Sequence, residues 1–162
     1  NTSNDLIVLN KFDGKIIEAN EMIFKKLGYY PEELKNMLPF QLFKQKNDLH
    51  LKRYVKSTLE TKNHVLFEAD IISKDGNEIP FEVSSHLFEV NGEKLVLSIA
   101  RDISDRKKNE NLIETRLQYE KAISSCSRKL LAVKPDDEAL NYALIFLLEA
   151  SEVSRVYISE FL

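Results

Sequence analysis

The sequence contains three histidines and one cysteine, side chains that often act as nucleophiles, proton carriers or metal ligands. A nucleophilic site needs a Ser, Cys or Asp arranged with a histidine, and the sequence around His50, His64 and His86 shows no such arrangement. Cys126 has no second cysteine, and no Cys/His spacing resembles a zinc site. The four glycines do not form a phosphate-binding loop. We therefore expect no catalytic residue, no metal site and no enzyme activity in this chain.

A more informative group of charged residues lies at 101–110, where an alternating apolar run ends and a charged run begins. Asp102 and Arg106 are four residues apart, so they share one face if a helix has started by residue 102. If Ser104 instead caps the helix, the same pair joins the strand end to the first helical turn. Either geometry ties a strand to a helix. The plainer alternative is a solvated charged surface, where an exposed pair contributes about 0–1 kcal/mol.

Composition limits the classes of protein. The chain has 162 residues, 43% of them hydrophobic, which suffices for one sizeable core. The net charge is −3 and no basic cluster is interleaved with aromatic residues, so we expect no nucleic-acid partner. A single cysteine favours a reducing, cytoplasmic compartment. No apolar run reaches the ~18 residues that span a bilayer, and the missing initiator Met indicates an excised fragment.

The elements that must position these residues begin with a hairpin. Residues 6–9 form an apolar run typical of a buried strand, and a turn at 13–14 leads to a second strand at 15–18. Asn20 is placed to cap a helix through its side-chain oxygen, and Gly28 ends that helix.

Further along, Pro31 opens a short helical turn, and Asp48 predicts the start of a longer amphipathic helix. Alternation of apolar and polar residues then predicts three strands, with Asn91-Gly92 as a hairpin turn, at 65–71, 79–87 and 95–100. The pattern indicates an α+β fold with a five-stranded antiparallel sheet and helices on one face. The space between the sheet and the helices is a natural small-molecule pocket.

Five motifs follow one another in a set order: A-N-E (19–21), L-G-Y-Y-P-E-E-L (27–34), S-K-D-G-N-E-I-P-F-E-V (73–83), V-N-G-E (90–93) and A-R-D-I-S-D-R-K (100–107). Together they resemble a PAS sensor domain with its C-terminal PAC part. In that family an Asp-Ile-Thr-like motif ends the last strand and starts a signalling helix, and here Ser104 stands in place of Thr. The resemblance implies that the output junction consists of Asp102, Ile103, Ser104 and Arg106.

The resemblance also limits the cofactors. Haem-binding relatives carry a histidine seven residues before a Tyr in an Arg-Tyr pair. That position is Asn47 here, and His50 is out of register. Flavin photosensors and yellow-protein relatives need a cysteine, and none precedes Cys126. Haem and covalent flavin are therefore not supported. Non-covalent flavin stays open as an alternative, without support from a motif. A small organic ligand, or none, remains.

For the wall of a ligand pocket we predict six side chains: Phe24, Phe43, Tyr54, Phe67, Phe81 and Leu97. The alternative is that these residues form a solid core without a ligand, as aromatic residues at such spacings commonly do.

Beyond the junction, residues recur at intervals of seven in two offset sets: Leu112, Tyr119, Cys126 and Val133, and Asn109, Arg116, Ile123 and Leu130. This spacing predicts a parallel coiled coil, and so a homodimer through the C-terminal helices. An amphipathic helix packed on its own chain is the alternative. The segments 121–131, 136–144 and 154–161 resemble the opening of a GAF domain, which is truncated here.

We therefore expect three parts: a PAS/PAC domain at 1–104, a signalling helix at 105–133 and the beginning of a GAF domain at 134–162. A PAS domain followed by a GAF domain implies a parent sensor histidine kinase in a two-component phosphorelay. The expected function is a sensory input module that passes ligand or partner state through the Asp102–Arg106 junction to a dimeric helix. The alternative is a structural dimerisation or protein-interaction module that binds no ligand.

Overall fold

The computed structural model describes residues 4–44, 48–132 and 144–145. The chain divides into two compact units, Asn1–Lys107 and Lys108–Leu162. Most of the segment that resembles a GAF domain lies outside the described residues. The first unit carries the fold and the candidate site.

The described residues of the first unit form five strands and four short or medium helices, as the α+β prediction requires. The strands are β1 (Leu6–Lys11), β2 (Ile16–Ala19), β3 (His64–Ile72), β4 (Glu78–Val90) and β5 (Glu93–Asp102). The helices are α1 (Glu21–Leu27), α2 (Pro31–Leu34), the 3-10 helix η1 (Pro39–Leu42) and α3 (Leu49–Lys62), and a long helix, α4 (Ser104–Ala132), follows β5.

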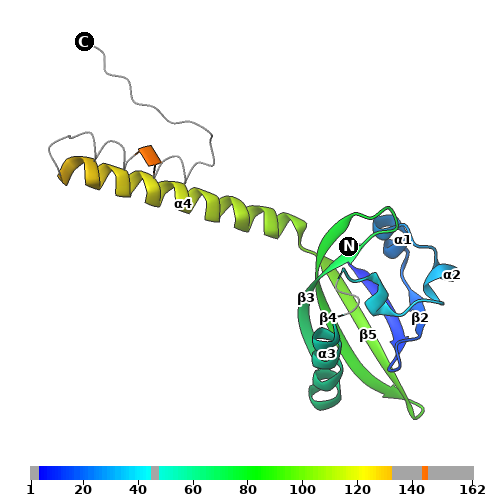
Figure 1. The fold of residues 1–162 in the computed structure, drawn as a ribbon. Coiled ribbons are helices and arrows are strands. Elements are labelled where there is room, and N and C mark those ends of the chain that lie inside the picture. Colours follow the sequence, from blue (N-terminus) through cyan, green and yellow to red (C-terminus); the bar gives the residue numbers. More distant parts are fainter. Residues whose placement is uncertain (1–3, 45–47, 133–143, 146–162) are drawn as a thin grey trace. The chain divides into compact units, whose positions relative to one another are not determined.

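The strands form one antiparallel sheet in the order β2-β1-β5-β4-β3 (Figure 1). Strands β1 and β5, the first and last of the unit, pair with each other inside the sheet, with Leu6 opposite Ala100. The β4–β5 hairpin turns at Asn91 and Gly92, whose φ angles of 52° and 79° are both positive, as a tight turn matching the strand twist requires. The predicted five-stranded antiparallel sheet is therefore confirmed.

Helix α3 begins as the sequence indicates, but α1 does not. Asp48 caps α3, because its Oδ1 accepts the backbone N–H groups of His50 (2.8 Å) and Leu51 (3.0 Å). Asn20 occupies the position before α1 without a side-chain cap. Its Oδ1 instead accepts the N–H of Ile7 (3.0 Å), and its Nδ2 donates to the Asp5 carbonyl (2.9 Å). The predicted Asn20 cap is wrong because this side chain ties the start of β1 to the segment before α1.

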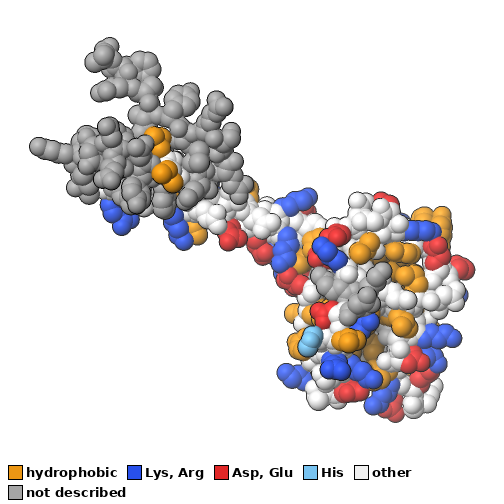
Figure 2. Space-filling view, viewed as in Figure 1, with side chains coloured by type: hydrophobic (Ala, Val, Ile, Leu, Met, Phe, Trp, Pro, Cys, Tyr) orange, Lys and Arg blue, Asp and Glu red, His pale blue; other side chains and the backbone are white. Residues whose placement is uncertain are grey.

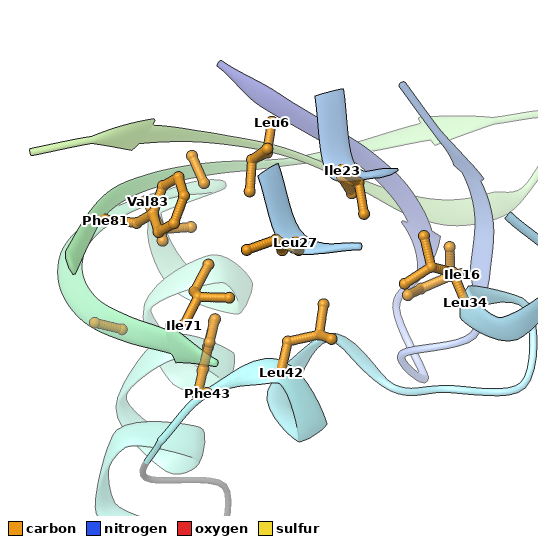
Figure 3. Packing of buried hydrophobic residues seen from close by; sticks show 12 residues of the cluster. Leu6, Ile16, Ile23, Leu27, Leu34, Leu42, Phe43, Ile71, Phe81 and Val83 are labelled. Carbon is orange, nitrogen blue, oxygen red and sulfur yellow. The ribbon is translucent and has the colours of Figure 1, made fainter. Parts of the chain in front are cut away.

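The core lies between the inner face of the sheet and the helices. Side chains alternate across a strand, so every second residue points inward. Figure 3 shows inward side chains such as Leu6, Phe81 and Val83 meeting Ile23 and Leu27 of α1. Phe81 is fully buried, and Ile23 and Leu27 are 1% exposed. The α1 stripe therefore packs against the inner face of the sheet.

No helix among the described residues is long and apolar enough to cross a bilayer.

Candidate functional site

A cavity of about 280 Å³ lies between the inner face of the sheet and the helices. Its volume is close to the lower end of the range for small-molecule sites, roughly 300–1,000 Å³. The strands contribute apolar walls at inward positions, including Leu6, Val8, Val83 and Val96. Helix α3 closes one side with Val55 and Leu59, and η1 and the residues beside it contribute Phe40, Leu42 and Phe43.

A short polar strip interrupts the apolar sheet wall. Asn10 on β1, Ser85 on β4 and Ser98 on β5 all line the cavity. Ser85 and Ser98 are directly opposite in the register, and their Oγ atoms are 2.8 Å apart. Asn10 lies opposite Val96, which makes Ser98 its diagonal neighbour. Three adjacent strands thus place hydrogen-bonding groups side by side in an otherwise apolar wall.

Much of this polar capacity is free to meet a ligand. Asn10 is only 6% exposed, and its Nδ2 donates one hydrogen bond to the Lys11 carbonyl (2.8 Å). Among the described residues, this hydrogen bond of the Asn10 side chain uses Nδ2 and not Oδ1. Of the two serine hydroxyls, one donates to the other, which leaves one O–H group available. The strip can therefore both donate to and accept from a bound molecule.

The more exposed side of the cavity carries charge. Lys52 and Lys56 of α3 line it, together with Asp13 from the β1–β2 turn. Lys52 is half-buried and Lys56 is exposed. The Lys52 Nζ lies 5.8 Å from the ring centroid of Phe40, and the Lys56 Nζ lies 5.6 Å from that of Phe12. Figure 2 shows Lys and Arg side chains around apolar ones on the face that carries α3.

Two of the six predicted pocket residues line the cavity. Phe43 and Phe67 do so with their rings edge to face, 6.0 Å between centroids. Phe81 is fully buried in the core and does not line the cavity.

The other three predicted pocket residues lie elsewhere. Phe24 is 44% exposed and stacks on Tyr30, because α1 turns Ile23 and Leu27 inward instead. Tyr54 is 52% exposed, since the inward stripe of α3 passes through Val55 and Leu59. Leu97 alternates with the cavity-lining Val96 and Ser98, so it belongs to the opposite sheet face.

The sequence analysis missed the polar strip and the two lysines. A signal for the strip was present, because Ser85 occupies an inward position in the alternation of β4 and Asn10 does so in β1. Polar residues at such positions are unusual in a core and mark a candidate site.

The segment predicted as an output junction begins with Asp102, at the end of β5. Its Oδ2 pairs with the Lys26 Nζ of α1 at 2.8 Å, and its Oδ1 accepts the Ser104 N–H at 2.9 Å. Partial burial raises the pKa of Asp102, but the hydrogen bonds from Lys26 and Ser104 outweigh it and hold this pKa below its ordinary 3.8. The carboxylate therefore stays ionised while it joins α1, β5 and the start of α4.

Arg106, in the first turns of α4, is held by the sheet. Its guanidinium pairs with Glu68 of β3 at 2.6 Å and with Glu82 of β4 at 3.2 Å. Lys107 also pairs with Glu68, at 2.7 Å, and its hydrogen bond lowers the pKa of that carboxyl. The predicted direct pair between Asp102 and Arg106 is wrong. Because α4 begins only at Ser104, Asp102 lies outside the helix and points to α1.

Ile103 provides the apolar part of the junction. It is 4% exposed, its N–H donates to the Pro80 carbonyl (3.0 Å), and its carbonyl accepts the Lys107 N–H (2.9 Å). The chain therefore passes from the last strand into α4 through a residue that is both buried and hydrogen-bonded on each side.

The histidines do not converge on the cavity. His50 is exposed on α3, while His64 and His86 stack on adjacent strands with ring centroids 4.4 Å apart. Among the described residues, no three His, Cys, Asp or Glu side chains form a metal-binding group. Asn47 and the Cys126 side chain lie outside what the structure describes.

Comparison with known proteins agrees with this architecture. Residues 4–105 match the family model of the PAS domain. A methyl sulfide methyltransferase-associated sensor from Methanosarcina acetivorans is 30% identical over 108 residues, which are 66% of this chain and 11% of that protein. The chain thus spans about a tenth of that relative.

Solved structures show the same fold. A PAS domain from Colwellia psychrerythraea is similar with a TM-score of 0.58 and 24% identity, covering 64% of this chain and 89% of that one. A domain of a sensory box sensor histidine kinase/response regulator from Geobacter sulfurreducens has a TM-score of 0.54 and 21% identity, covering 62% and 85%. With most of the first unit matched by the family model, the chain belongs to the PAS family of sensor domains.

Proposed function

We propose that this chain is the sensory input part of a longer signal-transduction protein, and that a small molecule in the cavity changes how α4 is held. The observation that carries this proposal is the position of neighbouring residues on the same strands. Phe67 and Val83 line the cavity, while the adjacent Glu68 and Glu82 hold Arg106 of α4. A ligand that shifts β3 or β4 therefore shifts the anchors of the helix directly.

Strand β5 also connects the cavity to the start of α4. Ser98 and Ala100 line the cavity, and the strand ends at Asp102, which pairs with Lys26 and receives the first N–H of α4. Packed elements tend to switch between discrete arrangements, which suits such a relay. Cavity, strand ends and helix start form one contiguous set of contacts.

For the rest of the protein, we propose a cytoplasmic sensor histidine kinase in a two-component phosphorelay. Support comes from the names of similar proteins, which include a sensor and a sensor histidine kinase domain. We retain the domain boundaries at 104/105 and 133/134 and the GAF domain from residue 134 as parts of this proposal. Within the present chain, the PAS part senses and does not catalyse.

A second candidate function is a dimerisation module that binds no ligand. Several apolar side chains of α4 are exposed, including Leu112 (69%), Ile113 (67%) and Ile123 (51%). A helix that exposes such residues commonly pairs with a partner helix. A homodimer through α4 is compatible with either function, so ligand binding is what separates them.

The test is a nuclear magnetic resonance titration of the ¹⁵N-labelled 162-residue chain with a library of small organic compounds. We expect compounds that shift the backbone amides of Ser85 and Ser98 also to shift those of Ser104–Lys107. Binding at the cavity that leaves the Ser104–Lys107 amides unmoved would contradict the relay. A library that yields no cavity binder would favour the dimerisation module.

A further inference from the structure

The two lysines that line the cavity differ from ordinary surface lysines in their surroundings. Lys52 and Lys56 are four residues apart on α3, so they share one helix face, and that face borders an apolar cavity. In the described part of the chain, neither forms an ion pair with a carboxylate, and their neighbours are the rings of Phe40 and Phe12. Beside apolar walls, two ammonium groups attract an anion more strongly than in open water.

The charged residues on the side of the cavity that carries Lys52 and Lys56 have a net positive charge. Asp13 is the one carboxylate among the described residues that line the cavity, and its Oδ1 accepts the Lys15 N–H at 3.0 Å. Lys94 adds a further ammonium group, 6.0 Å from the Phe12 centroid. Counting only the residues that line the cavity, two lysines against one aspartate leave a single positive charge, which matches a monoanion. A dianion would be costlier to transfer beside the apolar walls.

The opposite wall of the cavity carries uncharged hydrogen-bonding groups. Asn10, Ser85 and Ser98 offer an amide and a hydroxyl but no charge. Such groups suit a hydroxyl or carbonyl of a ligand. Between this strip and the lysines the walls are apolar, so the body of the ligand must be apolar too. No arginine lines the cavity in the described part of the chain, so the forked donor that suits a phosphate dianion is missing there.

We propose that the cavity takes a small organic acid with an apolar body, whose carboxylate lies at Lys52 and Lys56. A hydroxyl or carbonyl on the body, where present, lies at Asn10 and Ser98. This assignment rests on the proposed sensory function and names the chemical class of its ligand. The cavity of about 280 Å³ limits the acid to a compact body or a short chain.

The test compares three probes with the same hydrocarbon chain, namely octanoate, octan-1-ol and octylamine, on the ¹⁵N-labelled 162-residue protein at neutral pH and low salt. Affinity is measured by calorimetry, and the site is mapped by amide shifts at Ser85, Ser98 and the Asn10 side chain. We expect octanoate to bind about tenfold more tightly than the other two, since a hydrogen bond to a charged group contributes about 1.4 kcal/mol or more.

Three variants of α3 locate the effect. Lys52→Met and Lys56→Met, singly and combined, keep an unbranched side chain about one atom shorter and remove its charge. The double variant is expected to bind octanoate about tenfold more weakly and octan-1-ol as before. Lys62→Met, on the same helix but outside the cavity lining, is the matched control and is expected to retain full affinity. The amide spectrum of each variant verifies that it is folded.

The outcomes separate the ligand class from the sensory function. Octan-1-ol or octylamine binding at the cavity as tightly as octanoate would overturn the acid but leave a ligand-binding sensor. An equal loss of octanoate affinity in Lys62→Met would also overturn it, because the effect would then not belong to the cavity. Octanoate that binds without moving the Ser104–Lys107 amides supports the acid and contradicts the relay. Failure of all three probes to bind overturns the acid, and the compound library of the previous test then decides between the sensor and the dimerisation module.

Discussion

At the scale of single residues, the junction depends on which carboxylate meets which cation. Asp102 lies 76 positions from Lys26 in the sequence, and their side chains are 2.8 Å apart. Because at least 70% of each side chain is covered, this pair is screened less than a surface pair. The ion pair therefore joins α1 to the end of β5, two elements that are far apart in the sequence.

A double-mutant cycle measures that link. Asp102→Asn and Lys26→Met each remove one charge, and their combination is expected to show a coupling of about 0.5–1 kcal/mol in the free energy of unfolding. Urea denaturation gives the four values. Glu89→Gln, at an exposed position of β4, replaces Asp102→Asn in the control cycle, where the coupling should vanish. A coupling near zero for Asp102 with Lys26 would show that the pair contributes nothing.

The lowered pKa of Asp102 predicts a dependence on pH. A carboxyl whose folded pKa lies below its unfolded value stabilises the folded state above the unfolded pKa, near 3.8, and this contribution disappears as pH falls through the folded pKa. The stability difference between the wild type and Asp102→Asn should therefore be complete at pH 6 and shrink below about pH 4. Urea denaturation between pH 3 and pH 6 checks this. A difference that stays constant down to pH 3 would contradict it.

At the scale of secondary-structure elements, α1 has one face buried in the core and another face exposed to solvent. Ile23 and Leu27 are buried, whereas Phe24, the residue beside Ile23, is 44% exposed. The helical period of 3.6 residues separates these faces. Phe24 was predicted as part of a pocket wall, but it lies on the face of α1 that turns away from the buried Ile23 and Leu27.

The two faces of α1 should respond differently to truncation. Leu27→Ala is expected to destabilise the first unit by about 2–5 kcal/mol, because it leaves a hole in the core. Phe24→Ala removes only a partly exposed ring stacked on Tyr30, so about 1 kcal/mol or less is expected. Thermal and urea denaturation of both variants give the comparison. Equal losses would mean that Phe24 is a core residue after all.

The sheet could be predicted from the sequence to a large extent, and the site only in part. Alternation and the Asn91-Gly92 turn are local signals, so the three-strand meander was visible without knowledge of its neighbours. The partners of Asp102 and Arg106 are α1 and the strands β3 and β4, which become neighbours only in the folded sheet. A spacing of four residues could not predict those contacts, because it describes only pairs within one helix.

At the scale of the whole molecule, helix α4 extends from the junction into the second unit. Its described residues include Leu112, Ile113, Leu117, Tyr119 and Ile123, all at least 39% exposed. Leu112, Tyr119 and Ile123 occupy the positions of the seven-residue repeat that a coiled coil would bury. The heptad pattern stays a prediction until association is measured.

Charge in the predicted seam should prevent association. We expect the wild-type chain to sediment as a dimer and the Leu112→Lys/Ile123→Lys variant as a monomer, because lysines would face each other across the seam. Gln118→Lys, an exposed position outside the seam, is the control and should remain dimeric. Sedimentation equilibrium gives the masses. A monomeric wild type, or a seam variant that stays dimeric, would contradict dimerisation through this helix.

The central claim is that the occupancy of the cavity reaches α4 through the carboxylates of the sheet. The most direct measurement is hydrogen exchange of the Ser104–Lys107 amides in the 162-residue chain, with and without a cavity-bound compound, in the wild type and in Glu68→Gln/Glu82→Gln. The account predicts that the compound changes exchange in the wild type by at least about fivefold and has little effect in the variant, although both bind it equally well. The same change in both proteins, or no change in the wild type, would contradict the claim.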